Sequence, residues 1–387
     1  MDIRSFDFEK YFIVLSISIL LSCTSSCTVS SDRNGHSFND DGITVIDLCG
    51  SWYQMGRQYG LLAKEQIVDV LGYIDGKIGS DAAQIDSAYK IADALYAGYP
   101  DYLKEFFDGA SRTSGLNLER LKLCNAAEYV EALFYCSAMA VWDDYSAGKL
   151  VFGRNYDAQN YSEIFKDLLI TVFHPDNEIA AATIGYAGEF YCVNGLNENG
   201  IFIELNNGMP SAGEIIHWDM CPSTTRLFEL LFEAECLNDV DSFFESTRSF
   251  GSFIIGAADK TEARSYEWCF DGVRRGDVMT DDGLMLSTNH YVNDDWPYNI
   301  PDDDNSWNSI TRRSNLYEQA SKFKGEIDVE KMEEIMSTSL DDGGPMHDLT
   351  RYQIVAVPED LILYIKIPDM GRWASVDMDR YFSSDPS

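Results

Sequence analysis

The spacing of hydrophobic and polar positions changes near residue 136 of the chain. Before that point, apolar residues recur at every third or fourth position, which is typical of amphipathic helices. This spacing predicts helices over 50–78, 87–109 and 116–132, after one short strand at Ile43–Leu48. Beyond residue 136, short apolar runs bounded by turn residues predict strands instead. The pattern therefore indicates a mainly helical region followed by a strand-rich region.

The strand-rich region opens with a predicted hairpin. Cys136–Trp142 is an apolar run, Asp143–Lys149 is a polar turn, and Leu150–Asn155 returns alongside the first strand. We expect further strands over 168–174, 180–186, 192–207, 251–258, 263–268 and 284–290, and a closing hairpin over 352–367. Helices are predicted over 223–246, from Ser309 onward and over 328–337. Blocks of strands separated and followed by helices indicate an α+β protein.

The first forty or so residues have the pattern of an export leader and a linker. Tyr11–Leu21 is an apolar run too short to span a membrane, and it fits the core of a signal peptide. Leu20–Cys23 resembles a bacterial lipoprotein cleavage box, so residues 1–22 are predicted to be a signal peptide and Cys23 a lipidation site that tethers the chain to a membrane. An ordinary secretory signal is the alternative. Residues 23–42 are predicted to be a linker.

Composition argues against a nucleic-acid partner and against a disordered chain. The net charge is −35, from 64 acidic and 29 basic residues, so the chain is repelled by nucleic acid. The acidic residues are spread out and aromatic residues reach 13%, which argues against disorder. We expect an exported protein of the bacterial cell envelope or periplasm, lipid-anchored or secreted, with no nucleic-acid partner.

The nine cysteines give no sign of a metal site. Their spacing contains no CxxC pair and no regular framework. We therefore expect no metal site, and the mechanism implied by the resemblance described below requires no metal and no organic cofactor. Core positions are predicted for Cys49, Cys124, Cys192, Cys221, Cys236 and Cys269.

Cys136 is the candidate nucleophile. The predicted hairpin brings Arg154 and Asp157 near it, and a thiol beside these two groups on rigid strands could act as a nucleophile. The alternative is a buried core cysteine with an ion pair nearby, since free cysteine is among the most buried residue types.

Three segments resemble one superfamily. Cys136 with the apolar residues after it, followed by Phe152–Asp157, resembles the start of the mature chain in N-terminal nucleophile (Ntn) hydrolases. Gly50–Gly60 resembles the leader region of the acyl-coenzyme A:6-aminopenicillanic acid acyltransferase group, and Gly195–Gly200 resembles a segment of the choloylglycine (bile salt) hydrolases. The resemblance implies a four-layer αββα sandwich. It also implies a helical propeptide or small subunit over 43–135 and a catalytic domain over 136–387.

The same resemblance implies the site residues. The Tyr135–Cys136 bond would be cut, and the new α-amine of Cys136 would serve as the base for its own thiol. Arg154 and Asp157 would support the nucleophile, and Asn206 would stabilise the oxyanion. Leu286–Asn289 resembles a segment of the choloylglycine group whose asparagine lies in the active site, which implies Asn289 as a site residue. The helix that begins at Ser309 resembles an element that contributes a second arginine to the site. By spacing this arginine is Arg312 rather than Arg313.

The implied activity is that of a self-processed cysteine amidohydrolase or acyltransferase. It would cleave a linear amide C–N bond of a small N-acylated molecule through a Cys136 thioester, and self-cleavage would give two subunits in a chain that could also form a homo-oligomer. Two alternatives remain. One is a non-catalytic surface lipoprotein that binds an acyl or bile-acid-like ligand, and the other is a Cys-His protease using Cys136 and His290. Tyr135 departs from the penicillin acyltransferase, which has a glycine before its nucleophile.

Overall fold

The computed structural model describes residues 35–131, 135–159, 164–166, 168–213, 215–276, 282–367 and 370–383. The predicted signal peptide over 1–22, the predicted lipidation at Cys23 and the linker up to residue 34 lie outside the described residues. Within the described part of the chain, no helix is long and apolar enough to cross a membrane.

Two β-sheets form the centre of the fold. The larger sheet has nine strands in the order β1 (His36–Asp40), β2 (Ile43–Gly50), β5 (Leu169–Pro175), β6 (Ala181–Gly185), β7 (Asn194–Asn197), β8 (Phe202–Asn207), β9 (Phe253–Ala258), β10 (Ala263–Cys269) and β11 (Gly272–Arg275). The smaller sheet has six strands in the order β12 (Leu284–Ser287), β3 (Ser137–Val141), β4 (Val151–Asp157), β13 (Thr350–Val357), β14 (Ile362–Lys366) and β15 (Ala374–Asp377).

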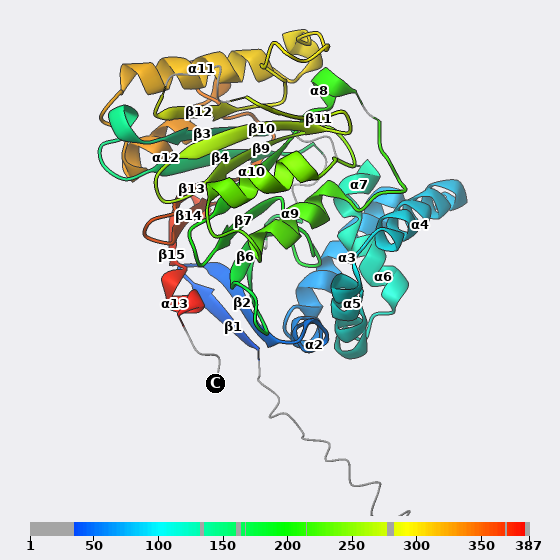
Figure 1. Cartoon of the computed structure of the whole chain (residues 1–387). Coiled ribbons are helices and arrows are strands. Elements are labelled where there is room, and N and C mark those ends of the chain that lie inside the picture. The colour runs from blue at the N-terminus through cyan, green and yellow to red at the C-terminus, as the bar shows by residue number, and fades with distance from the viewer. Residues whose placement is uncertain are drawn as a thin grey trace, which may run out of the picture. The chain divides into compact units, whose positions relative to one another are not determined.

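The two sheets pack face to face, and helices cover their outer faces. Between the sheets, Phe152 of β4 meets Phe202 of β8 with ring centroids 4.9 Å apart. Figure 1 shows helices outside each sheet: α9 (Ser223–Leu231) and α10 (Leu237–Ser246) pack on the larger one, and α11 (Ser309–Lys322) and α12 (Val329–Ser337) on the smaller one. The predicted four-layer αββα sandwich is confirmed.

Before the nucleophile segment, the described residues form six helices that lie together beside the sheets (Figure 1). They are α2 (Trp52–Leu62), α3 (Lys64–Ile78), α4 (Ala82–Ala97), α5 (Asp101–Ser114), α6 (Leu118–Asn125) and α7 (Ala127–Glu131). The short helices α8 (Met209–Ala212) and α13 (Asp379–Phe382) complete the described set. The expected helix over 87–109 is in fact the end of α4 and the start of α5. The chain breaks there because Pro100 disfavours a helical conformation in the residue before it.

The N-terminal segment differs from the sequence prediction at one place and agrees with it at another. Residues 36–40, expected to belong to a linker, form β1 and pair with β2. The ring of Phe38 lies 5.7 Å from that of Tyr381, so this polar strand gains a side-chain contact as well as its backbone pairing. The predicted strand over 43–48 lies in β2, which pairs in parallel with β5. The segment before Cys136 is therefore built into the larger sheet.

Helices α2 and α5 touch backbone to backbone. A Cβ atom added at Gly56 would lie 2.0 Å from the carbonyl oxygen of Phe106, and one added at Gly109 would lie 2.2 Å from that of Tyr53. No side chain fits at such distances, so both positions require glycine. A Cβ atom added at Gly60, one turn further along α2, would likewise lie 2.3 Å from the carbonyl oxygen of Ala110.

Replacing Gly56 with alanine should lower the free energy of unfolding by about 3 kcal/mol, because the helices must separate to admit the new methyl group. Gly76→Ala in α3 is the matched control, since nothing lies within 4 Å of its added Cβ atom. That control should be neutral or raise the free energy of unfolding by up to about 1 kcal/mol. Urea unfolding measures both, and equal stability of the two variants would refute the close contact.

The cysteines of the described residues are free thiols. Cys49, Cys124, Cys192 and Cys269 are buried as predicted, whereas Cys221 and Cys236 are only half-buried. Among the described residues, no group of three or more His, Cys, Asp or Glu side chains is arranged to hold a metal ion.

Candidate active site

The hairpin of β3 and β4 places an arginine against Cys136. The two strands are antiparallel, with Ala138 opposite Arg154, and Cys136 directly precedes β3. This register lets Nη2 of Arg154 donate a hydrogen bond to Sγ of Cys136 at 3.3 Å. Both side chains are fully buried. The sequence prediction that Arg154 lies near Cys136 thus agrees with the structure.

Opposing influences act on the Cys136 thiol. Burial raises its pKa, whereas Arg154, a hydrogen bond from the Asp157 backbone and Arg312 lower it, and the net direction is upward. The thiol is therefore protonated at neutral pH in this environment. A nucleophilic thiolate requires an additional base close to the sulfur.

Arg154 also links Cys136 to β8. Its Nη1 forms an ion pair with the Glu204 carboxylate and donates to Oδ1 of Asn206 at 3.2 Å, while Nη2 donates to the Leu205 carbonyl at 2.8 Å. Nδ2 of Asn206 in turn donates to Glu204 at 3.0 Å and to the Ser287 hydroxyl. Asn206 is thus connected to the thiol through a single arginine. Because its amide hydrogens already have partners, it must exchange one of them before it can bind an oxyanion.

Glu204 is the site residue that the sequence prediction missed. It is fully buried, and it lies two residues before Asn206 on the same face of β8, together with Phe202. A signal was present in the sequence, because a carboxylate inside an apolar strand requires a buried cation or hydrogen-bond donors.

Arg312 contacts the backbone of Cys136, whereas Arg154 contacts its thiol. Its Nη1 donates to the Cys136 carbonyl at 2.6 Å and to the Ser137 hydroxyl at 3.0 Å, and its Nη2 donates to Oδ1 of Asn289 at 2.8 Å. The neighbouring Arg313 instead donates to the Leu286 carbonyl at 2.6 Å. Of the two candidate arginines, the structure brings Arg312 to the nucleophile, together with Asn289.

Asp157 carries a buried oxygen atom without a hydrogen-bond donor. Its Oδ1 accepts a hydrogen bond from the Thr350 hydroxyl at 2.6 Å, but its buried Oδ2 has no such partner. Burial raises the pKa of this carboxyl group to about 6, although Arg312 and Thr350 act in the other direction. A buried polar atom without a partner costs about 1–3 kcal/mol, so its presence beside the nucleophile calls for an explanation.

Tyr135, at the predicted cleavage point, is buried against the loop that precedes α11. Its backbone N–H donates to the Asp157 carbonyl at 3.0 Å, and its ring lies 3.7 Å from that of Trp307. The carbonyl oxygen of Trp307 accepts a hydrogen bond from Nε of Arg312 at 3.2 Å. The two aromatic rings thus cover the peptide next to Cys136.

His290 is directed to other partners. Its Nδ1 lies 2.7 Å from the Ser309 hydroxyl and 3.3 Å from the Thr288 hydroxyl. Burial and the charge of Arg313 lower the pKa of His290 to about 4. The hydrogen bonds of the Cys136 thiol come from Arg154 and the Asp157 backbone, so the geometry does not favour a Cys-His pair.

A pocket with a cavity volume of about 90 Å³ adjoins these residues. Most of its walls are apolar and come from Val193, Leu205, Phe250 and Phe253. Two of its lining residues belong to the network around Cys136: the Leu205 carbonyl accepts from Arg154, and the Asn207 carbonyl accepts from Asn289 at 2.8 Å. The pocket wall is therefore one hydrogen bond away from Arg154, which contacts the thiol.

No protein-family model matches the sequence, and no curated protein matches it either. Among solved structures, the chain is similar to a Caenorhabditis elegans N-acylethanolamine-hydrolyzing acid amidase ortholog, with a TM-score of 0.46 and 16% identity over 62% of this chain and 99% of that one. It is similar to a conjugated bile acid hydrolase from Clostridium perfringens, with a TM-score of 0.42 and 14% identity over 63% of this chain and 93% of that one. It is also similar to a penicillin V acylase from Agrobacterium tumefaciens, with a TM-score of 0.46 and 10% identity over 65% of this chain and 89% of that one.

Proposed function

We propose that this chain is a cysteine amidase of the Ntn hydrolase type. It cuts its own Tyr135–Cys136 bond and then hydrolyses the linear amide of a small N-acylated molecule. The observation that carries the proposal is the buried Oδ2 of Asp157, which receives no hydrogen bond from the described residues and belongs to the residue whose backbone, with Arg154, binds the thiol. An ammonium group on Cys136 would supply the missing donor and a compensating charge.

The maturation step uses the groups around the scissile peptide. The Cys136 sulfur attacks the carbonyl carbon of Tyr135, and the C–N bond breaks as the thiol proton passes to the Cys136 nitrogen. The product is a thioester with a free amine on Cys136, and water then hydrolyses the thioester to a Tyr135 carboxylate and a restored thiol. Arg312 holds the Cys136 carbonyl during this exchange, since its Nη1 lies 2.6 Å from that oxygen.

The new amine then serves as the base that the buried thiol requires. An α-amine has a pKa of about 7.7–8.0, well matched to taking a proton from a thiol at neutral pH. The thiolate attacks the substrate carbonyl, and the Cys136 ammonium returns the proton to the leaving amine. Water, or another nucleophile in an acyl transfer, then releases the acyl group from sulfur.

Three side chains complete the proposed mechanism. Asn206 stabilises the oxyanion after releasing one of its present partners, and a donor of this kind typically contributes about 3 kcal/mol to transition-state stabilisation. Arg154 favours the thiolate through its charge, 3.3 Å from the sulfur. Asn289 holds Arg312 in position through the hydrogen bond of 2.8 Å between them.

Export and anchoring remain part of the proposal. The apolar run Tyr11–Leu21 and the box ending at Cys23 support secretion into the cell envelope with a lipid anchor on Cys23. Labelling of expressing cells with a radioactive fatty acid tests this point, because a Cys23→Ala variant should lose the label and keep its amidase activity.

The activity test screens N-acylated amines for released carboxylic acid. Wild-type protein should hydrolyse at least one class of these compounds, and Cys136→Ala should hydrolyse none because the nucleophile is gone. Cys236→Ser is the matched control: this thiol is half-buried at the start of α10 and its variant should keep full activity. An active Cys136→Ala variant would eliminate the thioester mechanism. Ligand binding without hydrolysis by the wild-type protein would favour the surface-lipoprotein alternative.

A further inference from the structure

The inner end of the pocket carries a carboxyl group that the proposed mechanism does not use. Glu128 of α7 lines the pocket and is buried. One carboxylate oxygen accepts a hydrogen bond from the Tyr156 hydroxyl, and the other accepts one from the Tyr191 hydroxyl at 2.8 Å. The hydroxyls of Tyr129 and Thr224, 2.8 Å apart, lie on the same pocket lining. The pocket thus combines apolar walls with one polar end.

Acidic side chains outnumber the cations that act on them beside the pocket, among the described residues. Glu189 is a second buried carboxyl group, and burial raises its pKa, with a smaller contribution from repulsion by Glu128. Arg154 is the cation that acts on both carboxyl groups, and it is already paired with Glu204. Burial raises the pKa of Glu128 to about 7, so this group is only partly ionised at neutral pH. A cation bound in the pocket would stabilise the charged form of Glu128, because buried charges are stable when they are paired.

We propose that the pocket binds an acyl group whose apolar chain ends in an ammonium group, with the chain against Leu205 and Phe253 and the ammonium on Glu128. The inference rests on the proposed amidase function and specifies its substrate class as N-(aminoacyl) amides. Phe253 and Leu205 provide the apolar path, and Leu205 reaches Arg154 through its carbonyl. The scissile carbonyl would then lie at the Arg154 end of the pocket and the ammonium at the Glu128 end.

This assignment gives the segment before the cleavage point a function in the mature protein. Glu128 precedes Cys136, so it can bind substrate only if the N-terminal piece stays attached after the cut. The pairing of β2 with β5 provides that attachment, because β2 belongs to the N-terminal piece and is an inner strand of the larger sheet, whereas β5 lies after Cys136. The small subunit is therefore expected to supply a specificity-determining residue, not only to cover the site.

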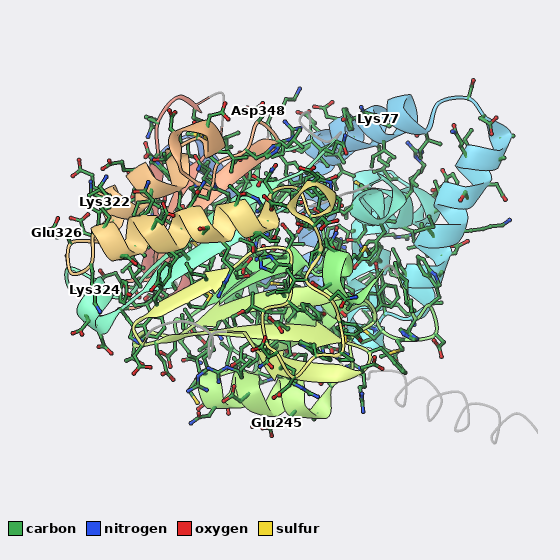
Figure 2. The ribbon with its side chains drawn as sticks, turned by 90° about the horizontal axis from the view of Figure 1, so that it is seen from above. Lys77, Glu245, Lys322, Lys324, Glu326 and Asp348 are labelled. Carbon is green, nitrogen blue, oxygen red and sulfur yellow. The ribbon has the colours of Figure 1, made fainter. Side chains whose placement is uncertain are left out.

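Binding to inactive protein tests the inference without requiring turnover. Calorimetry should compare hexanamide with its terminally aminated analogue on Cys136→Ala and on the Cys136→Ala/Glu128→Gln double variant. On the single variant the aminated amide should bind about tenfold more tightly, the effect of one charge-assisted hydrogen bond. The double variant should lose this preference. Adding Glu245→Gln to Cys136→Ala is the control, since Glu245 lies exposed on the outer side of α10 (Figure 2) and its loss should change nothing.

A kinetic comparison provides the second readout. Wild-type protein should hydrolyse the aminated hexanoyl amide of aminomethylcoumarin with about tenfold higher kcat/KM than the plain hexanoyl amide, with the difference in KM. If the Glu128→Gln variant does not fold, inhibition of wild-type turnover by aminated hexanamide measures the binding instead. Equal binding of both amides, or a preference that survives Glu128→Gln, would overturn the inference while leaving the amidase proposal intact. Binding preference without hydrolysis of any N-acyl amine would instead remove the amidase proposal.

Discussion

Replacing Arg154 with methionine is expected to lower the free energy of unfolding by about 3–5 kcal/mol, because the variant leaves a buried carboxylate without its cation. Glu204 is fully buried and pairs with Arg154 between the two sheets. The same change removes the hydrogen bond to the Cys136 sulfur, so amidase activity should also be lost. Denaturant unfolding and amide hydrolysis measure the two effects separately.

The double variant Arg154→Met/Glu204→Met separates charge from packing. Two apolar side chains of similar volume should recover most of the lost stability, since a buried ion pair is often no more stabilising than its hydrophobic replacement. Activity should stay absent in the double variant, because the thiol still has no guanidinium beside it. Equal stability of wild-type protein and Arg154→Met would show that the buried pair does not form as described.

Replacing Asp157 with asparagine is expected to reduce turnover by about a hundredfold or more, the usual size of a proton-transfer contribution. In the proposed mature protein, Oδ2 of Asp157 holds the Cys136 ammonium and fixes the proton that the thiol exchanges. Asparagine keeps the size of the side chain but removes its charge, so the fold should survive. Initial rates on the best N-acyl substrate measure the loss, and circular dichroism verifies the fold.

Thr350→Val is the matched control for this variant. Of the two carboxylate oxygens of Asp157, the Thr350 hydroxyl contacts Oδ1 and not Oδ2, at a distance of 2.6 Å. Loss of this hydroxyl should therefore cost much less activity than loss of the carboxylate. If Asp157→Asn and Thr350→Val have similarly small effects, Asp157 does not hold the amine. The unpartnered oxygen would then need another explanation.

Local sequence patterns were sufficient to predict that Arg154 lies against Cys136. The apolar run after Cys136 and the polar turn at Asp143–Lys149 fix a hairpin, and the hairpin register alone brings Arg154 to the sulfur. The order of helical and strand-like blocks predicted only an α+β protein, and the four layers came from the resemblance. The resemblance then suggested Asn206, Asn289 and one arginine of α11, and the structure gathers all three around Cys136 or Arg154.

Contacts between segments that are distant in the sequence could not be predicted from local patterns. Spacing favoured Arg312 over Arg313 but could not place either side chain, because consecutive residues of a helix point about 100° apart and the direction depends on how α11 sits on β3. Glu204 meets Arg154 across two sheets, over a separation of 50 residues. Glu128 reaches the pocket from a helix before the nucleophile. The pairing of β1 with β2 is local by contrast, because only Asp41 and Gly42 separate the two strands, and the linker prediction overlooked this hairpin signal.

Intact mass spectrometry of purified wild-type protein tests the central claim most directly. The account predicts two pieces that purify together, of which the larger comprises residues 136–387 and begins with a free amine on Cys136. Cys136→Ala should give a single uncut chain. A wild-type chain that remains uncut while it hydrolyses an amide at full rate would contradict the proposal that Cys136 acts through its own α-amine.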